Sequence, residues 1–249
     1  MALSSLLMHE VCKRLRPGMR VASVGYPDIV APLIEVKAIL GERFKQLRYR
    51  DDSDAIRKWH GGEGRIPDAY SFFELQAASL DVFDIAVLRG GEIILDFNYP
   101  ITDAYTERYD ALIDVGSAEH CFNIGTAIKN MATMLGQGGF VFHENPANWF
   151  NHGFWNINPT VYADFYGQDG FALRECWLVP RGQEPIRNVE RKKRFAYQGP
   201  EANMIAVAER VKVLPVEWVV QGKYKSMIAG ALPAAAGHPG ESQKEKELA

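Results

Sequence analysis

Segments with β-strand character alternate along this chain with segments that have helical periodicity. Strand-like runs are predicted at 19–24, 80–88, 92–97, 109–115 and 140–143, and several of the stretches between them carry apolar residues at helical spacing. Parallel strands need a crossover of about a dozen residues or more, which is usually a helix. Right-handed crossovers place such helices on both faces of the sheet. The alternation therefore predicts a doubly wound α/β fold with a mostly parallel sheet.

The composition is that of a globular protein with a full core. The chain has 249 residues, of which 47% are hydrophobic and 24% charged, and a net charge of -3 gives no global attraction to nucleic acid or anionic membranes. No apolar run approaches the roughly 20 residues of a membrane helix. Cys12, Cys121 and Cys176 are odd in number and widely spaced, which indicates reduced thiols in a cytoplasmic protein.

The pattern divides the chain into a main domain with extensions at both ends. Within residues 1–17, Leu3, Leu7 and Val11 share one face of a predicted short docking helix. The main domain is predicted over 18–211, with an insertion or lid at about 27–66. The segment 212–249 is a C-terminal extension, and its Ala-, Gly- and Pro-rich, then charged, composition predicts disorder after about residue 230.

Residues suited to ligand binding follow the predicted strands. In open parallel sheets, ligands bind outside the carboxyl ends of the strands. Gly25 follows the first strand and would let a ligand approach the backbone closely. Asp84 suits a ribose diol, and Asp96 with Phe97 suits the edge and face of an adenine. A turn role for the glycine and a capping or surface role for the acids are the structural alternatives.

Three segments together resemble the class I S-adenosylmethionine-dependent methyltransferases. They are YDALIDVGSAEH (109–120), AIKNMATMLGQGGFVF (127–142) and QDGF (168–171). The resemblance implies a seven-stranded, Rossmann-like sheet in which the last strand, at 204–211, is antiparallel. It implies S-adenosyl-L-methionine as cofactor and S-adenosyl-L-homocysteine as product. Cofactor contacts are then assigned to Gly25, Tyr26, Asp84, Asp96, Phe97, Val115 and Gly116.

The loop after the first strand departs from the family pattern. The family usually has Gly-x-Gly-x-Gly here, whereas this chain keeps Gly25 and continues with Tyr26, Pro27 and Asp28. Pro27 also removes a backbone donor. This departure supports an alternative hypothesis, a non-catalytic domain of the same fold that serves as a binding or regulatory module. A nicotinamide-dependent oxidoreductase is disfavoured because GxGxxG is missing after the first strand.

The resemblance implies methyl transfer by in-line displacement, in which the protein mainly aligns the acceptor. A hydroxyl acceptor also gains from a general base, and histidine has a suitable pKa. The candidates are His120, His143 and His152, with Glu119 or Glu144 to orient one of them. Packed or exposed histidines and a helix-starting acid are the structural alternatives.

An aromatic and amide-rich segment at 145–156 suggests the acceptor. Aromatic rings stack on the apolar faces of sugars and amides bond to hydroxyls, so Asn148, Trp149, His152 and Trp155 are predicted to bind substrate. A lid or a homodimer contact is the alternative. The nearby acids show no ligand spacing that requires a metal, and the basic run at 187–194 is interpreted as a solvated loop. The predicted function is O-methylation of a sugar or related small hydroxylated metabolite, without nucleic-acid or membrane partners.

Overall fold

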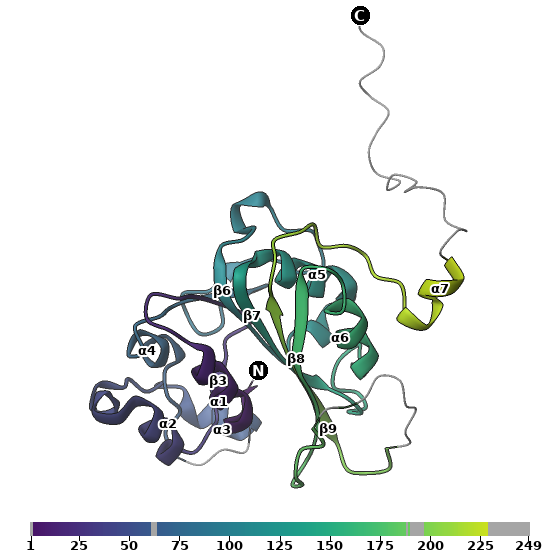
Figure 1. The fold of residues 1–249 in the computed structure, drawn as a ribbon. Coiled ribbons are helices and arrows are strands. Elements are labelled where there is room, and N and C mark those ends of the chain that lie inside the picture. Colours follow the sequence, from purple (N-terminus) through teal and green to yellow (C-terminus); the bar gives the residue numbers. More distant parts are fainter. Residues whose placement is uncertain (1, 61–63, 188, 190–196, 229–249) are drawn as a thin grey trace, which may run out of the picture.

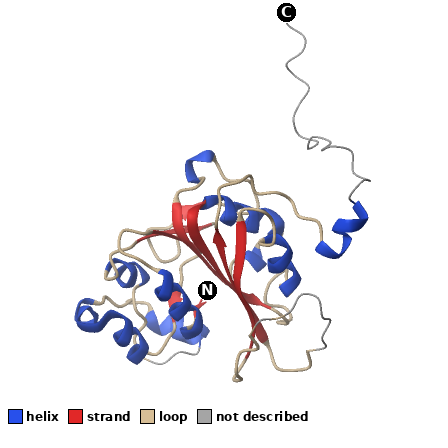
Figure 2. Ribbon diagram, viewed as in Figure 1, coloured by secondary structure: helices blue, strands red, loops and turns tan. Residues whose placement is uncertain are grey.

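A seven-stranded sheet forms the centre of the computed structural model, which describes residues 2–60, 64–187, 189 and 197–228 (Figures 1 and 2). Its strand order is β5-β4-β2-β6-β7-β9-β8, and of these strands β9 alone runs opposite to the other six. The strands are β2 (Arg20–Val24), β4 (Ser79–Asp84), β5 (Ile93–Ile94), β6 (Tyr109–Val115), β7 (Leu135–Pro146), β8 (Phe171–Pro180) and β9 (Ala202–Arg210). This order, with the antiparallel last strand between β7 and β8, confirms the predicted Rossmann-like methyltransferase fold.

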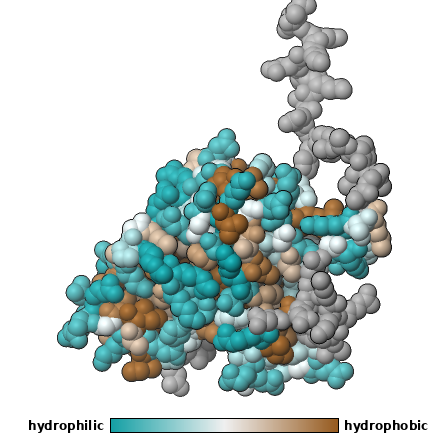
Figure 3. All heavy atoms as spheres, in the orientation of Figure 1, coloured by the Kyte–Doolittle hydropathy of each residue, from teal (hydrophilic) through white to brown (hydrophobic). Residues whose placement is uncertain are grey.

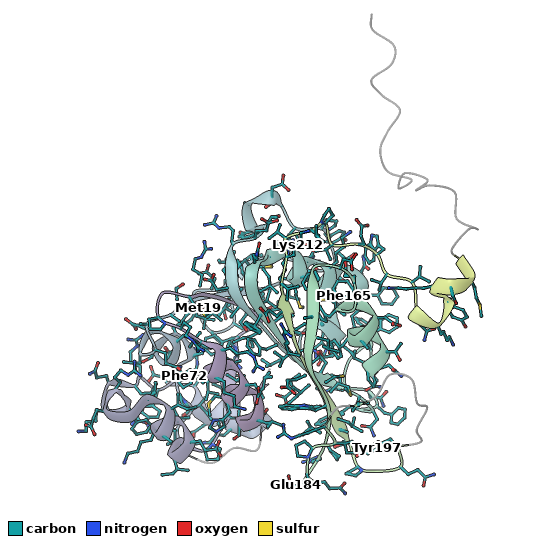
Figure 4. All side chains as sticks on the ribbon, in the orientation of Figure 1. Met19, Phe72, Phe165, Glu184, Tyr197 and Lys212 are labelled. Atoms are coloured by element: carbon teal, nitrogen blue, oxygen red, sulfur yellow. The ribbon has the colours of Figure 1, made fainter. Side chains whose placement is uncertain are left out.

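The direction of β9 can be followed at the two ends of the sheet. Figure 4 shows Glu184, shortly after the carboxyl end of β8, at the bottom of the molecule and Lys212, shortly after the carboxyl end of β9, at the top. The carboxyl ends of the parallel strands therefore lie at the lower edge of the sheet in this view. The described part of the basic segment, which includes Arg187, follows β8 at this edge, whereas residues 191–194 lie outside the described part of the chain.

The strands match the sequence prediction best where they are buried on both sides. β6 has the predicted bounds, and six of its seven residues are buried. β4 ends at Asp84 instead of Leu88, because Ile85, Val87 and Leu88 turn into solvent, where 73%, 61% and 61% of their surfaces are exposed. β7 begins at Leu135, before the predicted strand at 140–143, and pairs with β6.

Helices cover both faces of the sheet, as the crossovers require (Figure 2). On one side lie α1 (Ser5–Arg14), α2 (Leu33–Leu40) and α4 (Ala69–Glu74), and on the other lie α5 (Ile124–Met134) and α6 (Pro159–Phe165). Side chains cap the N-termini of α4 and α6: the Asp68 side chain accepts a hydrogen bond from the Ser71 N–H, and the Asn158 side chain accepts one from the Thr160 N–H.

Alternate residues of the central strands feed two cores. Ala22 and Leu112 face the α5 and α6 side, whereas Val21 and Ile113 face the α1 and α4 side, as period-two alternation requires. Figure 4 shows Phe72 and Phe165 in the helical layers on opposite sides of the sheet. Space-filling spheres show separate apolar patches among polar residues on the viewed face (Figure 3).

The N-terminal helix belongs to the core of the main domain. α1 buries Leu7, Met8 and Val11 in the same cluster as the sheet, and Ser4 caps it by accepting from the Leu7 N–H. β1 (Ala2–Leu3) pairs with β3 (Asp28–Ile29) in a small parallel ladder. The N-terminus is thereby attached to the start of the predicted insertion.

The remaining elements are short. The insertion also holds the 3-10 helix η1 (Gly41–Gln46) and α3 (Ser53–His60), and other short helices are η2 (Asp103–Tyr105), η3 (Ala118–His120), η4 (Gly222–Tyr224) and α7 (Lys225–Ile228). Figure 1 shows α7 at the margin, away from the sheet. No helix in the described ranges has both the length and the apolar content to cross a membrane. The disorder predicted after about residue 230 concerns residues outside those ranges.

Candidate functional site

The carboxyl ends of β2, β4 and β6 open into one cavity of about 1240 Å³. The strand order reverses between β2 and β6, and this switch point is where open α/β sheets bind ligands. Small-molecule pockets usually measure roughly 300–1,000 Å³. The cavity is therefore large enough for a nucleoside-sized cofactor together with a second molecule.

The structure brings together all but one of the predicted cofactor residues. Lining the same cavity are Gly25, Asp84, Asp96, Phe97, Val115 and Gly116. Gly25 and Gly116 have φ of 74° and 84°, a left-handed conformation that strains other residues. Both strand ends therefore present bare backbone to the cavity.

Tyr26 is the exception, and its assignment to the cofactor site is corrected. Its side chain is 1% exposed and packs in the core on the α1 and α4 side. The hydroxyl donates to Asp68 Oδ2 over 2.9 Å and accepts from the Ala69 N–H over 2.8 Å. Since the chain turns at Gly25, the next side chain points to the other face of the sheet, where it holds the start of α4.

Asp84 and Asp96 are oriented by the backbone that follows them. Asp84 Oδ1 accepts from the Ile85 N–H over 2.7 Å, and Asp96 Oδ1 accepts from the N–H and the side-chain amide of Asn98 over 2.9 and 2.8 Å. Within the described chain, Oδ2 of each carboxylate has no hydrogen bond to protein. Each acid therefore keeps one oxygen for a ligand that enters the cavity.

A second group of polar residues lines the cavity beyond β6. They are Glu119 and His120 of η3, and His152 of the loop that follows β7. Glu119 is fully buried, whereas the side chains of His120 and His152 are 51% and 41% exposed. Glu119 Oε1 lies 3.5 Å from His152 Nε2 and 3.9 Å from His120 Nε2. We call these three residues the EHH cluster.

Glu119 also has a buried polar support. Its Oε2 accepts from Asn145 Nδ2 over 3.0 Å, and the same amide nitrogen donates to Asp114 Oδ2 over 3.1 Å. Burial, and secondarily the charge of Asp114, raise the pKa of Glu119 to about 7. Burial and the neighbouring His152 lower the pKa of His120. Groups with pKa values shifted in this way are typical of functional clefts.

His143 is removed from the candidate bases. It is fully buried, its Nδ1 bonds to Asp114 Oδ2 over 2.8 Å, and its Nε2 bonds to the Tyr166 hydroxyl over 2.7 Å. Both ring nitrogens are therefore engaged inside the protein, and an acceptor in the cavity cannot reach them. Glu144 does not orient a histidine either, because it accepts hydrogen bonds from Ser4 and Asn203.

The aromatic segment divides into lining residues and residues that hold the loop. Trp149 and His152 line the cavity. Asn148 instead attaches the loop to β9, since its Oδ1 accepts from the Ala202 N–H over 2.7 Å. The Trp155 indole donates to the Cys121 carbonyl over 3.1 Å. Asn148 and Trp155 therefore position the loop and are not among the residues that line the cavity, so their contact with substrate stays a prediction.

Sequence reasoning missed Asn145 and Gly153. Asn145 follows His143 at period two on β7, and this spacing could have placed both on one buried face. Gly153 allows the loop to approach η3: a Cβ there would lie 2.9 Å from Glu119 Cγ and 3.0 Å from its carbonyl oxygen. No motif in the sequence indicates that contact.

The chain matches no protein-family model and no curated protein. Among solved structures it is similar to 1,6-didemethyltoxoflavin-N1-methyltransferase of Burkholderia thailandensis, with bound S-adenosylhomocysteine (11% identity, 83% of this chain and 79% of that chain, TM-score 0.45). It is also similar to the trans-methyltransferase CalH (14% identity, 82% of this chain but 54% of that chain, TM-score 0.45). A Rhodobacter sphaeroides protein described as a Zn-dependent alcohol dehydrogenase is similar too (11% identity, 81% and 87%, TM-score 0.39). At these identities the likeness concerns backbone arrangement, and the named activities belong to those proteins.

Proposed function

We propose that this protein transfers a methyl group from S-adenosyl-L-methionine to a hydroxyl of a small molecule. One observation carries the proposal: the same cavity is lined by Gly25, Asp84 and Asp96 at one part and by Glu119 and His152 at another. The first set suits a nucleoside with a charged tail, and the second suits a hydroxyl that must lose its proton. The cavity is large enough for both molecules at once.

The cofactor part fits S-adenosyl-L-methionine on the donor set that is present. Asp84 would accept hydrogen bonds from the ribose diol through Oδ2, and Asp96 would accept from the adenine amino group. Phe97, held edge-on against Phe83 with ring centroids 6.2 Å apart, provides an apolar wall. Gly25 and Gly116 leave backbone uncovered for the methionine portion. The bound sulfonium would supply an electrophilic methyl group.

The acceptor part favours a sugar or a related hydroxylated metabolite. Trp149 offers a ring to the cavity, and the EHH cluster offers imidazole and carboxylate groups beside it. An aromatic ring stacks on the apolar face of a sugar, while imidazoles and carboxylates bond to its hydroxyls. The overall charge of -3 and the mixed lining suit a neutral, polar small molecule better than a nucleic acid.

The EHH cluster can accept the proton that the acceptor hydroxyl loses. In the proposed step, the acceptor O–H bond breaks, its proton passes to an imidazole nitrogen of His120 or His152, and an O–CH3 bond forms as the S–CH3 bond breaks. The Glu119 carboxylate at 3.5 Å stabilises the imidazolium of His152. The remaining contribution of the protein is alignment of the two molecules.

Calorimetry with S-adenosyl-L-methionine and S-adenosyl-L-homocysteine tests the cofactor part directly. The expected result is saturable binding of both molecules to one site per chain. Incubation with pooled hydroxylated metabolites should then give products heavier by one methylene. The absence of binding up to about millimolar concentration would favour the non-catalytic module that the loop after β2 suggests.

A further inference from the structure

We propose that the EHH cluster is a binding site for a divalent cation of the zinc type, at the acceptor part of the cavity. Glu119 Oε1 lies 3.5 Å from His152 Nε2 and 3.9 Å from His120 Nε2, and potential ligand atoms of the three residues all lie within 4.8 Å of one another. The sequence does not indicate this site, because His152 comes from a loop that is separate from η3.

An unsatisfied buried oxygen is the second observation. Glu119 has no exposed surface, and its Oε1 has no hydrogen-bond partner among the described residues, although Oε2 accepts from Asn145. A buried carboxylate oxygen without a partner costs free energy. Since Oε1 lies within 4 Å of both imidazole nitrogens, a cation bound by these three atoms would satisfy it.

The cluster is supported so that its ligands are already oriented. The Phe154 N–H donates to the Glu119 carbonyl over 2.9 Å, which ties the loop that carries His152 to η3. Gly153 allows that approach, since a Cβ would meet Glu119 at 2.9 Å. Asn145 Nδ2 donates a hydrogen bond to the other oxygen of Glu119, Oε2, and so fixes the carboxylate. Metal sites characteristically have such outer hydrogen bonds, which orient the ligands.

The donor types select the cation. Two imidazole nitrogens and one carboxylate suit Zn²⁺, Fe²⁺ and related metals, whereas Mg²⁺ and Ca²⁺ prefer oxygen donors. With metal–ligand bonds of about 2.1 Å, tetrahedral ligands lie about 3.4 Å apart and octahedral ligands about 3.0 Å. Glu119 Oε1 lies 3.5 and 3.9 Å from the two imidazole nitrogens, closer to the tetrahedral value. Three protein ligands with one open position are typical of catalytic zinc.

The role of this cation rests on the proposed methyl transfer, whereas the site itself does not. An acceptor hydroxyl in the open position would be coordinated through oxygen, and its proton would leave to solvent as the O–CH3 bond forms. The cation stabilises the alkoxide and replaces the imidazoles as the group that activates the acceptor. His120 and His152 are then ligands.

Titration of the full chain, without a polyhistidine tag and after chelator treatment, tests the site. The probes are Zn²⁺ and Mg²⁺ by calorimetry and Co²⁺ by visible absorption, which reports tetrahedral geometry. The expected result is one Zn²⁺ per chain, much weaker Mg²⁺ binding and a tetrahedral Co²⁺ spectrum. His152→Ala and the isosteric Glu119→Gln should each weaken Zn²⁺ binding by about tenfold or more. His9→Ala is the matched control, since His9 is half-exposed and pairs with Glu35 away from the cavity.

The two proposals fail separately. Lack of saturable Zn²⁺ binding, or equal binding by wild type and His152→Ala, overturns the metal site while cofactor binding persists. If methyl transfer is unaffected by a chelator, the cation has no role in the reaction. His120 or His152 is then the base that accepts the proton of the acceptor. If Zn²⁺ binds as expected but S-adenosyl-L-methionine does not, the metal site stands and the proposed function is overturned.

Discussion

Glu119 and Glu144 are two buried carboxyl groups that line the same cavity with different surroundings. Glu144 accepts from Ser4 Oγ over 2.7 Å and from Asn203 Nδ2 over 3.3 Å, so both its oxygens have protein partners. Glu119 keeps Oε1 without a hydrogen bond in the described chain and close to two imidazoles. The first arrangement serves the packing of the N-terminus, and the second can receive a ligand.

Asp84→Ala tests the cofactor assignment at a single side chain. Its loss would leave a ribose hydroxyl unpaired and should cost roughly 1–3 kcal/mol, or about 5- to 150-fold in affinity for S-adenosyl-L-homocysteine by calorimetry. Asp103→Ala is the control because Asp103 is exposed and outside the cavity. Equal affinities for Asp84→Ala and wild type would remove Asp84 from the site.

Glu144→Gln tests burial through the pH dependence of stability. Burial raises the pKa of Glu144 above its ordinary 4.5, so above that value the folded state binds more protons than the unfolded chain. The free energy of unfolding therefore falls as pH rises from about 4.5 towards the folded pKa. Glutamine does not titrate. In urea denaturation, the stability of the variant relative to wild type should thus be greater at pH 8 than at pH 5.

The matched control is Glu42→Gln, because Glu42 is exposed and forms a surface ion pair with Lys45. Its stability relative to wild type should change little between the two pH values. If Glu144→Gln behaved in the same way, ionisation of Glu144 would carry no cost in the folded state.

At the scale of elements, contact between η3 and the loop after β7 forms the acceptor part of the cavity. The loop is attached at three places: to β9 through Asn148, to the Glu119 carbonyl through the Phe154 N–H, and to the Cys121 carbonyl through Trp155. None of these contacts is local in sequence. Small displacements of the loop should therefore affect acceptor chemistry while leaving the cofactor part intact.

Gly153→Ala should separate these two parts of the site. The added Cβ would meet the Glu119 carbonyl oxygen at 3.0 Å, and a backbone oxygen cannot move without shifting η3 or the loop. Since misplacement by about 1 Å can cost about 100-fold in rate, turnover should fall about 10- to 100-fold while S-adenosyl-L-homocysteine affinity stays unchanged. Phe150→Ala is the control in the same loop, because Phe150 is 90% exposed. Unchanged turnover in Gly153→Ala would show that loop placement is unimportant.

At the scale of the whole molecule, α1 and the insertion form part of one folded unit with the sheet. Leu7 is fully buried in the core cluster that contains Val21, Ile113 and Phe142. Leu3 pairs with Ile29 at the start of the insertion. The N-terminal segment therefore contributes to the stability of the main domain.

Leu7→Ala measures that contribution. Removing a buried leucine side chain leaves a cavity and should lower the free energy of unfolding by roughly 2–5 kcal/mol in urea denaturation. Ile34→Ala is the control, because Ile34 is 74% exposed on α2. A loss for Leu7→Ala as small as that for Ile34→Ala would mean that α1 is detached from the core in solution.

The sequence alone determined the alternation of strands and helices, and strand β6, in which six of seven residues are buried, was predicted with its observed bounds. Periodicity is a local property, so it is visible without the fold. It also located Gly25, Asp84 and Asp96, because residues that follow parallel strands must meet at one edge of the sheet.

The tertiary structure decided which of the candidate side chains reach the cavity. His120 and His143 are both candidate bases by sequence. In the structure, however, His143 bonds to Asp114 and Tyr166 in the core, while His120 lines the cavity. Tyr26 packs in the core on the other face of the sheet, and Asn148 and Trp155 form hydrogen bonds that hold their loop. The EHH cluster exists only because a distant loop packs on η3. Side-chain direction and contacts between remote segments depend on packing in three dimensions, which no local pattern encodes.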